Sequence, residues 1–333
     1  MNQYTSSLKD IILGDATAQA PARASVLHEL NQANRRLEKL LADLRSENNA
    51  ESELLGIARE VIAAVDMNPD IALACIFLNQ INGTYAVRHC IETAIVATLV
   101  ARRMRKPNEE VLVIAAAALT MNVGMLRHQN TFHKSSNLTS EEMSIVRRHP
   151  EESVDLLRDA GVSDQEWIAC VLLHHENDDG TGYPAGCTRD EITQNARLIS
   201  LADRYCAQVS ARNYRCSVLP DQALHNLLGD PAKFNDPALA EQFGKQLGKY
   251  PPGALVRLQN GEVGVVTQRE PSGELHIHCL RDAAGKSLRN GGQWILTLRR
   301  SSEPACEVAE ALTEDQADVR FSMKQIWGEQ ASL

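Results

Sequence analysis

The chain has 333 residues, of which 44% are hydrophobic, and this predicts a globular protein with one large core and an appendage, or with two modest domains. Its formal net charge of −9 argues against a general nucleic-acid-binding protein, although a few local arginines could still hold a small phosphate ligand. The eight cysteines lack a C-x-x-C pattern, so we expect buried free thiols rather than disulfides or zinc ligands.

Targeting signals are missing from the pattern of the sequence. No apolar run reaches the roughly 20 residues that span a bilayer, and Val111 to Leu119 indicates a buried helix instead. The first residues do not show the basic and apolar pattern of a signal peptide. We therefore expect a cytoplasmic protein without a membrane span.

The N-terminal region, residues 1–49, begins with a small, polar and irregular lead. A helix follows, in which apolar residues recur at alternating spacings of four and three, at Val26, Leu30, Ala33, Leu37, Leu40 and Leu44. Two interpretations stay open. The seam forms a short coiled coil that makes the chain a homodimer, or the helix is amphipathic and packs on its own domain.

Residues 50–249 predict one all-α domain. Turn and breaker residues such as Asn68-Pro69, Gly83 and Pro107 separate its apolar segments. Thr139 or Ser140 offers an N-cap with a glutamate in the first turn. We expect helices over residues 51–79 with a break near Asn68, and then over 84–105, 109–121, 140–148, 151–160, 164–174, 195–211 and 220–229.

The pattern changes after Tyr250-Pro251-Pro252-Gly253. Asn260-Gly261 lies between two β-like runs and predicts a hairpin, and residues 275–280 alternate like a third strand. His276 and His278 share one face of that strand, but no carboxylate or cysteine beside them suggests a metal site. Residues 250–303 are therefore taken as a small β-containing extension, and 304–333 as an acidic tail without a chemical motif.

The segment His174–Pro184 carries the strongest chemical signal. Two adjacent histidines end an apolar helical run, and Gly180, Gly182 and Pro184 then force a turn. Adjacent side chains at a helix end project about 100° apart, so both rings can reach one metal centre without chelating it as an i, i+4 pair does. The simpler alternative is an exposed histidine pair on a loop.

Further histidines and a carboxylate occupy helix ends or buried helix faces of the same domain. His89, His149 and Asp203 join the pair His174 and His175 in this set. One such histidine alone would more often be an ordinary buried residue. Several that converge on a helical bundle would suit manganese, iron or zinc, because these ions accept imidazole and carboxylate ligands.

The string His174-His175-Glu176-x-x-Asp179-Gly180-x-Gly182-Tyr183-Pro184 resembles the signature of the HD-GYP family. The resemblance covers about residues 50–267. It extends to Thr84-Tyr85-Ala86-Val87-Arg88-His89, Lys134, Leu138-Thr139-x-Glu141-Glu142, His149-Pro150, Ala196-Arg197-x-Ile199-x-x-Ala202-Asp203, Arg212-Asn213-Tyr214-Arg215 and Tyr250-Pro251-Pro252-Gly253. It implies a mostly α fold: an HD-type helical bundle, here with an N-terminal helical or coiled-coil segment and a small C-terminal β-hairpin region.

The resemblance also implies a function and a set of site residues. Family members use two or three metal ions, often iron or manganese, to hydrolyse cyclic di-GMP to linear pGpG or GMP. By position in the motif, the implied metal ligands are His89, His149, His174, His175 and Asp203. The implied ligand-binding residues are Arg212 and Arg215, which would contact phosphate or guanine, and Tyr183 with Gly182 and Pro184. Other implied partners are a diguanylate cyclase or another signalling protein.

One departure from the family pattern changes this expectation. Where the family has its His-Asp pair, this sequence has Met121-Asn122. A thioether is a poor ligand for manganese or iron(II), and a neutral amide cannot hold two dications together. We expect an incomplete binuclear site that holds one divalent ion (iron, manganese or zinc) or none. His128 and His133 could replace the lost ligands only if their loop approached the bundle.

Three functions follow as hypotheses. The first is a degenerate member that binds cyclic di-GMP or a partner protein, with weak or absent hydrolysis. The second is an active phosphodiesterase that works with a reduced metal site, most simply the three-histidine set of His149, His174 and His175. The third is an interaction module without a nucleotide ligand. Metal content, turnover and ligand binding distinguish them.

Overall fold

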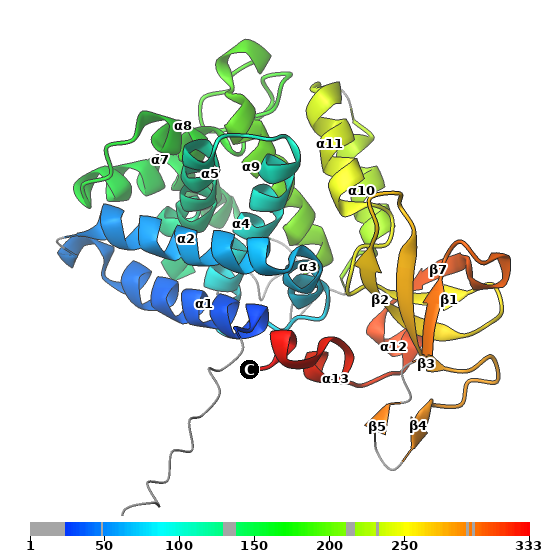
Figure 1. Ribbon diagram of the computed structural model, residues 1–333. Coiled ribbons are helices and arrows are strands. Elements are labelled where there is room, and N and C mark those ends of the chain that lie inside the picture. The colour runs from blue at the N-terminus through cyan, green and yellow to red at the C-terminus, as the bar shows by residue number, and fades with distance from the viewer. Residues whose placement is uncertain are drawn as a thin grey trace, which may run out of the picture.

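The structure is a computed structural model that describes residues 24–47, 49–128, 138–210, 217–230, 233–290, 293–294 and 297–333. A helical body forms one side of the molecule and a small antiparallel sheet the other, with α10 and α11 above the sheet (Figure 1). This confirms the expected mostly α fold with a C-terminal β region. The candidate site lies entirely in the helical body, so the sheet contributes no residue to it.

The N-terminal helix α1 (Val26–Ala42) packs on its own chain. Ser25 caps it by accepting a hydrogen bond from the His28 amide at 3.3 Å. The heptad residues Val26, Leu30 and Leu37 are fully buried, mainly against α2 (Ala50–Met67), which lies beside α1 in Figure 1. Of the two interpretations of the seam, the structure shows packing on its own domain, because burial within the chain leaves no apolar stripe for a coiled coil.

Three helices form the centre of the body: α4 (Tyr85–Arg103), α5 (Asn108–Thr120) and α9 (Gln194–Val209). Residues 115–118 are four alanines with no exposed surface, so α5 approaches its neighbours closely. The stretch Asn108–His128 has the length and apolarity of a membrane-spanning helix, but 67% of its most apolar window is buried inside the protein. This is the environment of a core helix, as the sequence predicted for Val111 to Leu119.

The remaining helices surround this centre. Two predicted helices, 140–148 and 151–160, are in fact one helix, α7 (Ser140–Asp159), which continues through Pro150. The prediction of a break was wrong, because α7 continues although Pro150 has no amide hydrogen to donate. The other bounds are close to those expected for α3 (Pro69–Phe77), α8 (Gln165–Leu173) and α10 (Pro220–Leu228), whereas the helix α11 (Pro237–Leu247) was not predicted.

In the described part of the chain, five strands form an antiparallel sheet in the order β6-β3-β2-β1-β7. The Asn260-Gly261 turn joins β1 (Leu255–Leu258) to β2 (Val263–Arg269), with Gly261 at φ 87°, and β3 (Leu275–Arg281) follows, as predicted. Two edge strands, β6 (Thr297–Arg300) and β7 (Val308–Leu312), were not predicted, and a short β4–β5 pair (Arg289–Asn290, Gln293–Trp294) stands apart.

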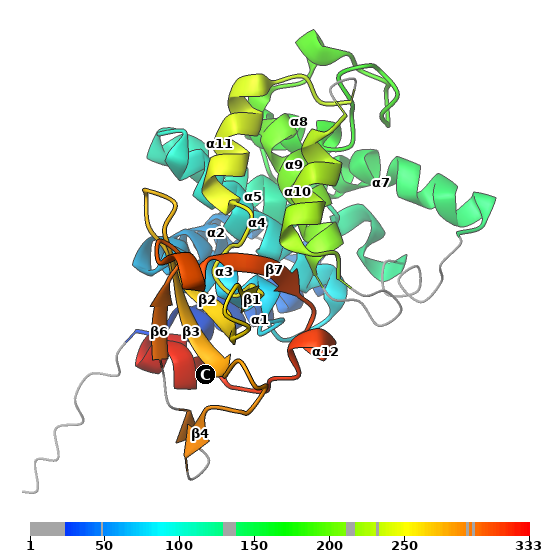
Figure 2. The ribbon, with the colours of Figure 1, turned by 90° about the vertical axis from the view of Figure 1, so that its right-hand side faces the viewer.

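The acidic tail is part of the folded structure. Its strand β7 pairs with β1, and after α12 (Glu314–Ala317) the chain returns beneath the helical body (Figures 1 and 2). There the Trp327 indole of α13 (Met323–Trp327) donates to the Thr267 carbonyl of β2 at 3.0 Å. The Ser25 hydroxyl donates to the Ser332 carbonyl at 2.5 Å. The last residues therefore tie the sheet to the start of α1.

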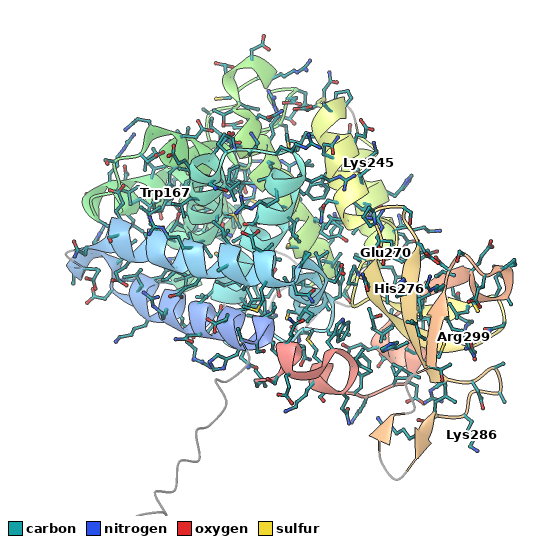
Figure 3. All side chains as sticks on the ribbon, in the orientation of Figure 1. Trp167, Lys245, Glu270, His276, Lys286 and Arg299 are labelled. Carbon is teal, nitrogen blue, oxygen red and sulfur yellow. The ribbon has the colours of Figure 1, made fainter. Side chains whose placement is uncertain are left out.

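A polar junction joins the sheet to the helices above it. Arg269 of β2 donates from Nη1 to the Lys245 carbonyl at the end of α11, at 2.6 Å. Figure 3 shows Glu270 and His276 near the Lys245 end of α11, whereas Trp167 lies far away inside the helical body. His276 Nε2 is 3.5 Å from a Glu270 oxygen, so the structure places beside this histidine a carboxylate that the sequence had not led us to expect.

Candidate metal centre

The middle of α7 and the end of the neighbouring helix α8 bring three histidines together. His149 lies in the middle of α7, and His174 and His175 follow the last residue of α8. One ligating atom from each ring lies within 4.8 Å of the others. Among the residues that the structure describes, this is the group of His, Cys, Asp and Glu side chains with the geometry for a metal ion. His149 and His174 are fully buried, and His175 is partly exposed.

Main-chain carbonyls orient two of these rings. Pro150 lacks an amide hydrogen, so the Val146 carbonyl loses its usual helical donor, and His149 Nδ1 takes that place at 2.6 Å. At the end of α8, His174 Nδ1 donates to the Val171 carbonyl at 2.7 Å. A carbonyl can only accept, so both Nδ1 atoms carry the proton, and both Nε2 atoms present lone pairs.

The two lone pairs point at the same place. His149 Nε2 lies 3.3 Å from His174 Nε2, with no proton left to share between them. Two nitrogen ligands on a tetrahedral zinc ion are separated by roughly 3.3 Å, given bonds of about 2.0–2.1 Å. A cation between these atoms would turn the repulsion of two lone pairs into two bonds. The residues present therefore fit a metal ion.

Burial keeps these imidazoles neutral. It lowers the pKa of His149 to about 3, and it also holds the pKa values of His174 and His175 below the usual range. The neighbouring rings oppose protonation further, since each would add a positive charge beside the next. Neutral imidazole is the form that binds a metal, so the cluster does not first have to release protons near pH 7.

The other two predicted ligands pair with each other. His89 of α4 and Asp203 of α9 are buried, and His89 Nε2 lies 2.7 Å from Asp203 Oδ1. Burial alone would disfavour the Asp203 carboxylate, but the hydrogen bond from His89 and the nearby imidazoles outweigh it and hold its pKa well below its usual range. Neither residue joins the three-histidine group at its 4.8 Å spacing. The five predicted ligands thus form two separate subsets.

Met121 and Asn122 lie between these two subsets. The backbone of Asn122 is next to Cys90, the neighbour of His89 in α4. On the other side, Ser153 of α7 donates to the Met121 carbonyl at 3.0 Å. The Asn122 side chain is buried, and its Oδ1 has no hydrogen-bond partner among the described residues. The turn that carries Asn122 therefore contacts the helices of both subsets, and its buried amide brings no negative charge to it.

Gly124 holds this turn against α7. Its amide donates to the Ser153 hydroxyl at 2.9 Å. A Cβ at this position would lie only 2.6 Å from the His149 carbonyl, so a larger residue would push the turn away from the metal ligand. The sequence from Met121 to Gly124 therefore keeps its close contact with the His149 helix although its ligands differ from the family pattern.

The loop after His175 is fixed by Glu176. This buried carboxylate accepts hydrogen bonds from the amides of Ala185, Gly186 and Cys187 at 2.8–3.1 Å. Gly182 packs so tightly that a Cβ would lie 2.4 Å from the Glu176 Cα. The loop thus has one defined shape, in which the peptide bond before Pro184 is cis.

This shape places Tyr183 on the histidines. Its ring stacks on His175, with 4.7 Å between the ring centroids, and it meets His149 edge-on at 6.3 Å. Burial raises the pKa of the Tyr183 phenol, so the hydroxyl keeps its proton at neutral pH. Tyr183 can therefore act as a hydrogen-bond donor at the rim of the metal centre.

Some predicted residues cannot be placed. Arg212, Arg215, His133 and Lys134 lie outside the described residues. His128 is exposed in the described part of the chain, and it does not join the three-histidine group. The structure therefore gives no support to His128 as a replacement ligand.

The sequence analysis missed Arg204. This arginine directly follows Asp203 in α9, and its Nη2 donates to Asn177 Oδ1 at 2.7 Å. The signal in the sequence was a cation next to a predicted ligand on an amphipathic helix. It could have been noticed there, but its reach to the loop of Asn177 depends on the packing of α9.

Comparison with known proteins identifies the family. A family model described as HD domain matches residues 37–239, so the chain belongs to the HD domain family. Two curated relatives are "Cyclic di-GMP phosphodiesterase PA4108" of Pseudomonas aeruginosa, 31% identical over 63% of this chain and 50% of that protein, and "Cyclic di-GMP phosphodiesterase response regulator RpfG" of Xanthomonas campestris pv. campestris, 34% identical over 43% of this chain and 38% of that protein. The chain spans about half of these relatives or less.

A solved structure agrees with this identification at the level of the fold. It is that of "Bd1817, a HDG"Y"P protein from Bdellovibrio bacteriovorus", with a TM-score of 0.54 and 15% identity over 69% of this chain and 73% of that one. This fold agrees with the HD domain family, and the motif around His174–Pro184 is the part of the chain that resembles the HD-GYP signature.

Proposed function

We propose that this protein binds cyclic di-GMP, or a partner protein in response to it, with weak or absent hydrolysis. The observation that carries the proposal is Asn122. Its uncharged side chain is buried on a turn that contacts both the helix of His89 and the helix of His149, where a shared carboxylate would be needed to join the two subsets. The relatives are named as phosphodiesterases for cyclic di-GMP, which supports this nucleotide as the ligand.

The charge at this position decides how many ions the site can hold. Two dications a few ångströms apart repel each other strongly, and a bridging carboxylate offsets this repulsion. The Asn122 amide has no net charge to offer, and the Met121 thioether is a weak ligand for manganese or iron(II). The close contact between His89 and Asp203 fits the same conclusion, because two ligands that satisfy each other do not need an ion.

One divalent ion fits the remaining site. His149, His174 and His175 would hold iron, manganese or zinc, in a centre that is half of a binuclear one. When bound, such an ion supplies a Lewis acid that can polarise a phosphate oxygen. Tyr183 offers a hydroxyl donor beside this position, and Gly182 and Pro184 set the shape of the loop that carries it.

The rest of the proposal follows the family. Arg212 and Arg215 are proposed to contact phosphate or guanine. A diguanylate cyclase or another signalling protein is the proposed partner, and the cytoplasm is the proposed location. A homodimer stays part of the proposal, through a surface other than the buried seam of α1.

An active phosphodiesterase with a reduced metal site is the second candidate. The specific observation in its favour is the lone-pair geometry of His149 and His174, which is ready for an ion. The two candidates differ in turnover. Metal content and cyclic di-GMP hydrolysis should be measured on one sample supplied in turn with manganese, iron and zinc.

Rapid turnover in that experiment would overturn the first proposal and establish the second. Calorimetry completes the test. Binding of cyclic di-GMP in the micromolar range or tighter, abolished by Arg212→Ala, supports the proposed ligand. A protein that is folded and metal-loaded but binds no cyclic di-GMP would instead be an interaction module.

A further inference from the structure

Arg204 connects α9 to the loop that follows the histidine pair. Its Nη2 donates to Asn177 Oδ1 at 2.7 Å, and the Glu176 carbonyl lies 3.4 Å away. These contacts use one nitrogen of a guanidinium that has five N–H groups. Both contacts leave the Nε and Nη1 atoms of Arg204 without a hydrogen-bond acceptor among the described residues.

The charge of Arg204 is also not matched by an ion pair in the described part of the chain. Asp203, the adjacent carboxylate, is 2.7 Å from His89 instead. Burial lowers the pKa of the Arg204 guanidinium, while the nearby carboxylates of Asp203, Asp178 and Asp179 favour its charged form. An arginine keeps its charge at neutral pH even when its pKa falls, so a partly buried cation stands beside the metal centre, near these carboxylates but not in direct contact with them.

A cavity of about 330 Å³ opens at this cation. Asp203 and Arg204 form its wall on α9, so it begins at a residue of the candidate site. Two amide side chains, Gln208 and Asn226, add polar groups, and Phe234 adds an aromatic face. Lys233 brings a second cation, which is 3.4 Å from the carboxylate of Asp230. Arg204 is therefore the cation of this wall that forms no direct ion pair within the described part of the chain.

We propose that Arg204 binds a phosphate of the ligand from this cavity. Its free N–H groups would donate to the phosphate oxygens, and its fixed position beside Asp203 would hold the phosphodiester against the three-histidine centre. In this way a guanidinium supplies part of the positive charge that a second metal ion would supply. The identity of the ligand as cyclic di-GMP rests on the proposed function, whereas the phosphate contact itself does not.

The test measures ligand affinity by calorimetry for the full-length wild type and four variants. Arg204→Gln removes the charge, and Arg204→Lys keeps it. Asn177→Ala removes the acceptor that anchors Arg204 but leaves the guanidinium in place. Arg59→Gln is the matched control, because Arg59 is exposed on α2, away from the cavity. The ligands are cyclic di-GMP, guanosine, and bis(4-nitrophenyl) phosphate as a simple phosphodiester.

We expect Arg204→Gln to weaken cyclic di-GMP binding by about tenfold or more at low salt, with a smaller loss at high salt. Arg204→Lys should recover part of the affinity. Asn177→Ala should lose less affinity than Arg204→Gln, because the guanidinium loses an anchor but keeps its charge. Arg59→Gln should bind like the wild type, and guanosine binding should be the same in all proteins. Equal melting temperatures for the wild type and Arg204→Gln would show that the loss is not due to unfolding.

Several results would overturn the inference. They are wild-type affinity in Arg204→Gln, an equal loss in Asn177→Ala, or an equal loss for guanosine. If the wild type fails to bind cyclic di-GMP but binds bis(4-nitrophenyl) phosphate through Arg204, the proposed function fails and this inference holds. If the wild type binds neither phosphodiester, both fail.

Discussion

The two halves of the candidate site use similar residues but differ in whether their side chains already have hydrogen-bond partners. In the half built from α7 and α8, three neutral histidines face one another, and two of them direct lone pairs at a common point. In the half built from α4 and α9, His89 and Asp203 are joined by a 2.7 Å contact. The first half offers lone pairs to a cation from outside, whereas in the second the Asp203 carboxylate is already hydrogen-bonded to His89.

This difference shows that ligand types alone do not define a metal site. A histidine and an aspartate both bind metal ions well. When the two are buried side by side, they can instead stabilise each other through a hydrogen bond. A second ion shared with the three-histidine half would compete for His89 and Asp203, but Asn122 lacks the charge to hold such an ion. The replacement of the family's aspartate by Asn122 therefore has its functional consequence at His89 and Asp203, not at Asn122 itself.

The largest expected effect is on the half built from His89 and Asp203. His89→Ala would leave the Asp203 carboxylate buried without its partner, which should cost about 3–5 kcal/mol in the free energy of unfolding. Urea unfolding measures this cost. Metal content should stay the same, because the three-histidine cluster is intact. Loss of metal from His89→Ala would show that the two halves share an ion.

The half built from the three histidines should control metal binding. His174→Ala removes a ligand and the ring that faces His149, so metal affinity should fall by more than the roughly 10–100-fold that loss of a supporting residue costs. Metal analysis after dialysis against a weak chelator measures the change. His276→Ala on the sheet is the matched control. A His174→Ala protein that keeps its metal would place the ion elsewhere.

The two halves should join when the family ligands are restored. In the double variant Met121→His, Asn122→Asp, a carboxylate returns to the position between them, so we expect a second bound ion and a rise in cyclic di-GMP turnover of about 10²-fold. Metal stoichiometry and hydrolysis are measured together, with Asn122→Asp alone as the control. An unchanged double variant would mean that the proposed defect is not at this pair.

As the pH falls, the contribution of the three histidines to folding stability should be lost before that of the His89–Asp203 pair. The pKa of His149 is lowered to about 3 in the folded protein, so between its usual pKa of 6.5 and 3 only the unfolded chain takes up this proton. Folding stability of the metal-free protein should therefore fall as the pH falls, by about 2 kcal/mol between pH 6.5 and 5 for this residue. His149→Gln should show a shallower pH dependence in denaturant unfolding. The contribution of Asp203, whose pKa is also lowered, should disappear only at lower pH, below its usual value of 3.8.

Much of the site could be predicted from local sequence. The apolar run before His174, together with Gly182 and Pro184 after it, indicates a helix end and a tight turn, and both are present. The helix bounds in the body were close because their breakers are local as well. These features depend on neighbours in the sequence, which is the information that a single sequence contains.

The rest depends on contacts between distant segments. The heptad seam of α1 is compatible with a second chain or with its own domain, and only the position of α2 decides between them. The strand β7 has an acidic sequence that forms a strand because β1 offers it a free edge. The pairing of His89 with Asp203 spans 114 residues, and Arg204 reaches the loop at Asn177 across the packing of two helices.

Pro150 shows how the protein exchanges stability for function. A proline inside a helix normally lowers stability, and here its cost comes with a carbonyl that selects the ring tautomer of a metal ligand. Pro150→Ala should thus yield a protein that melts at a higher temperature but holds its ion less tightly, by about tenfold.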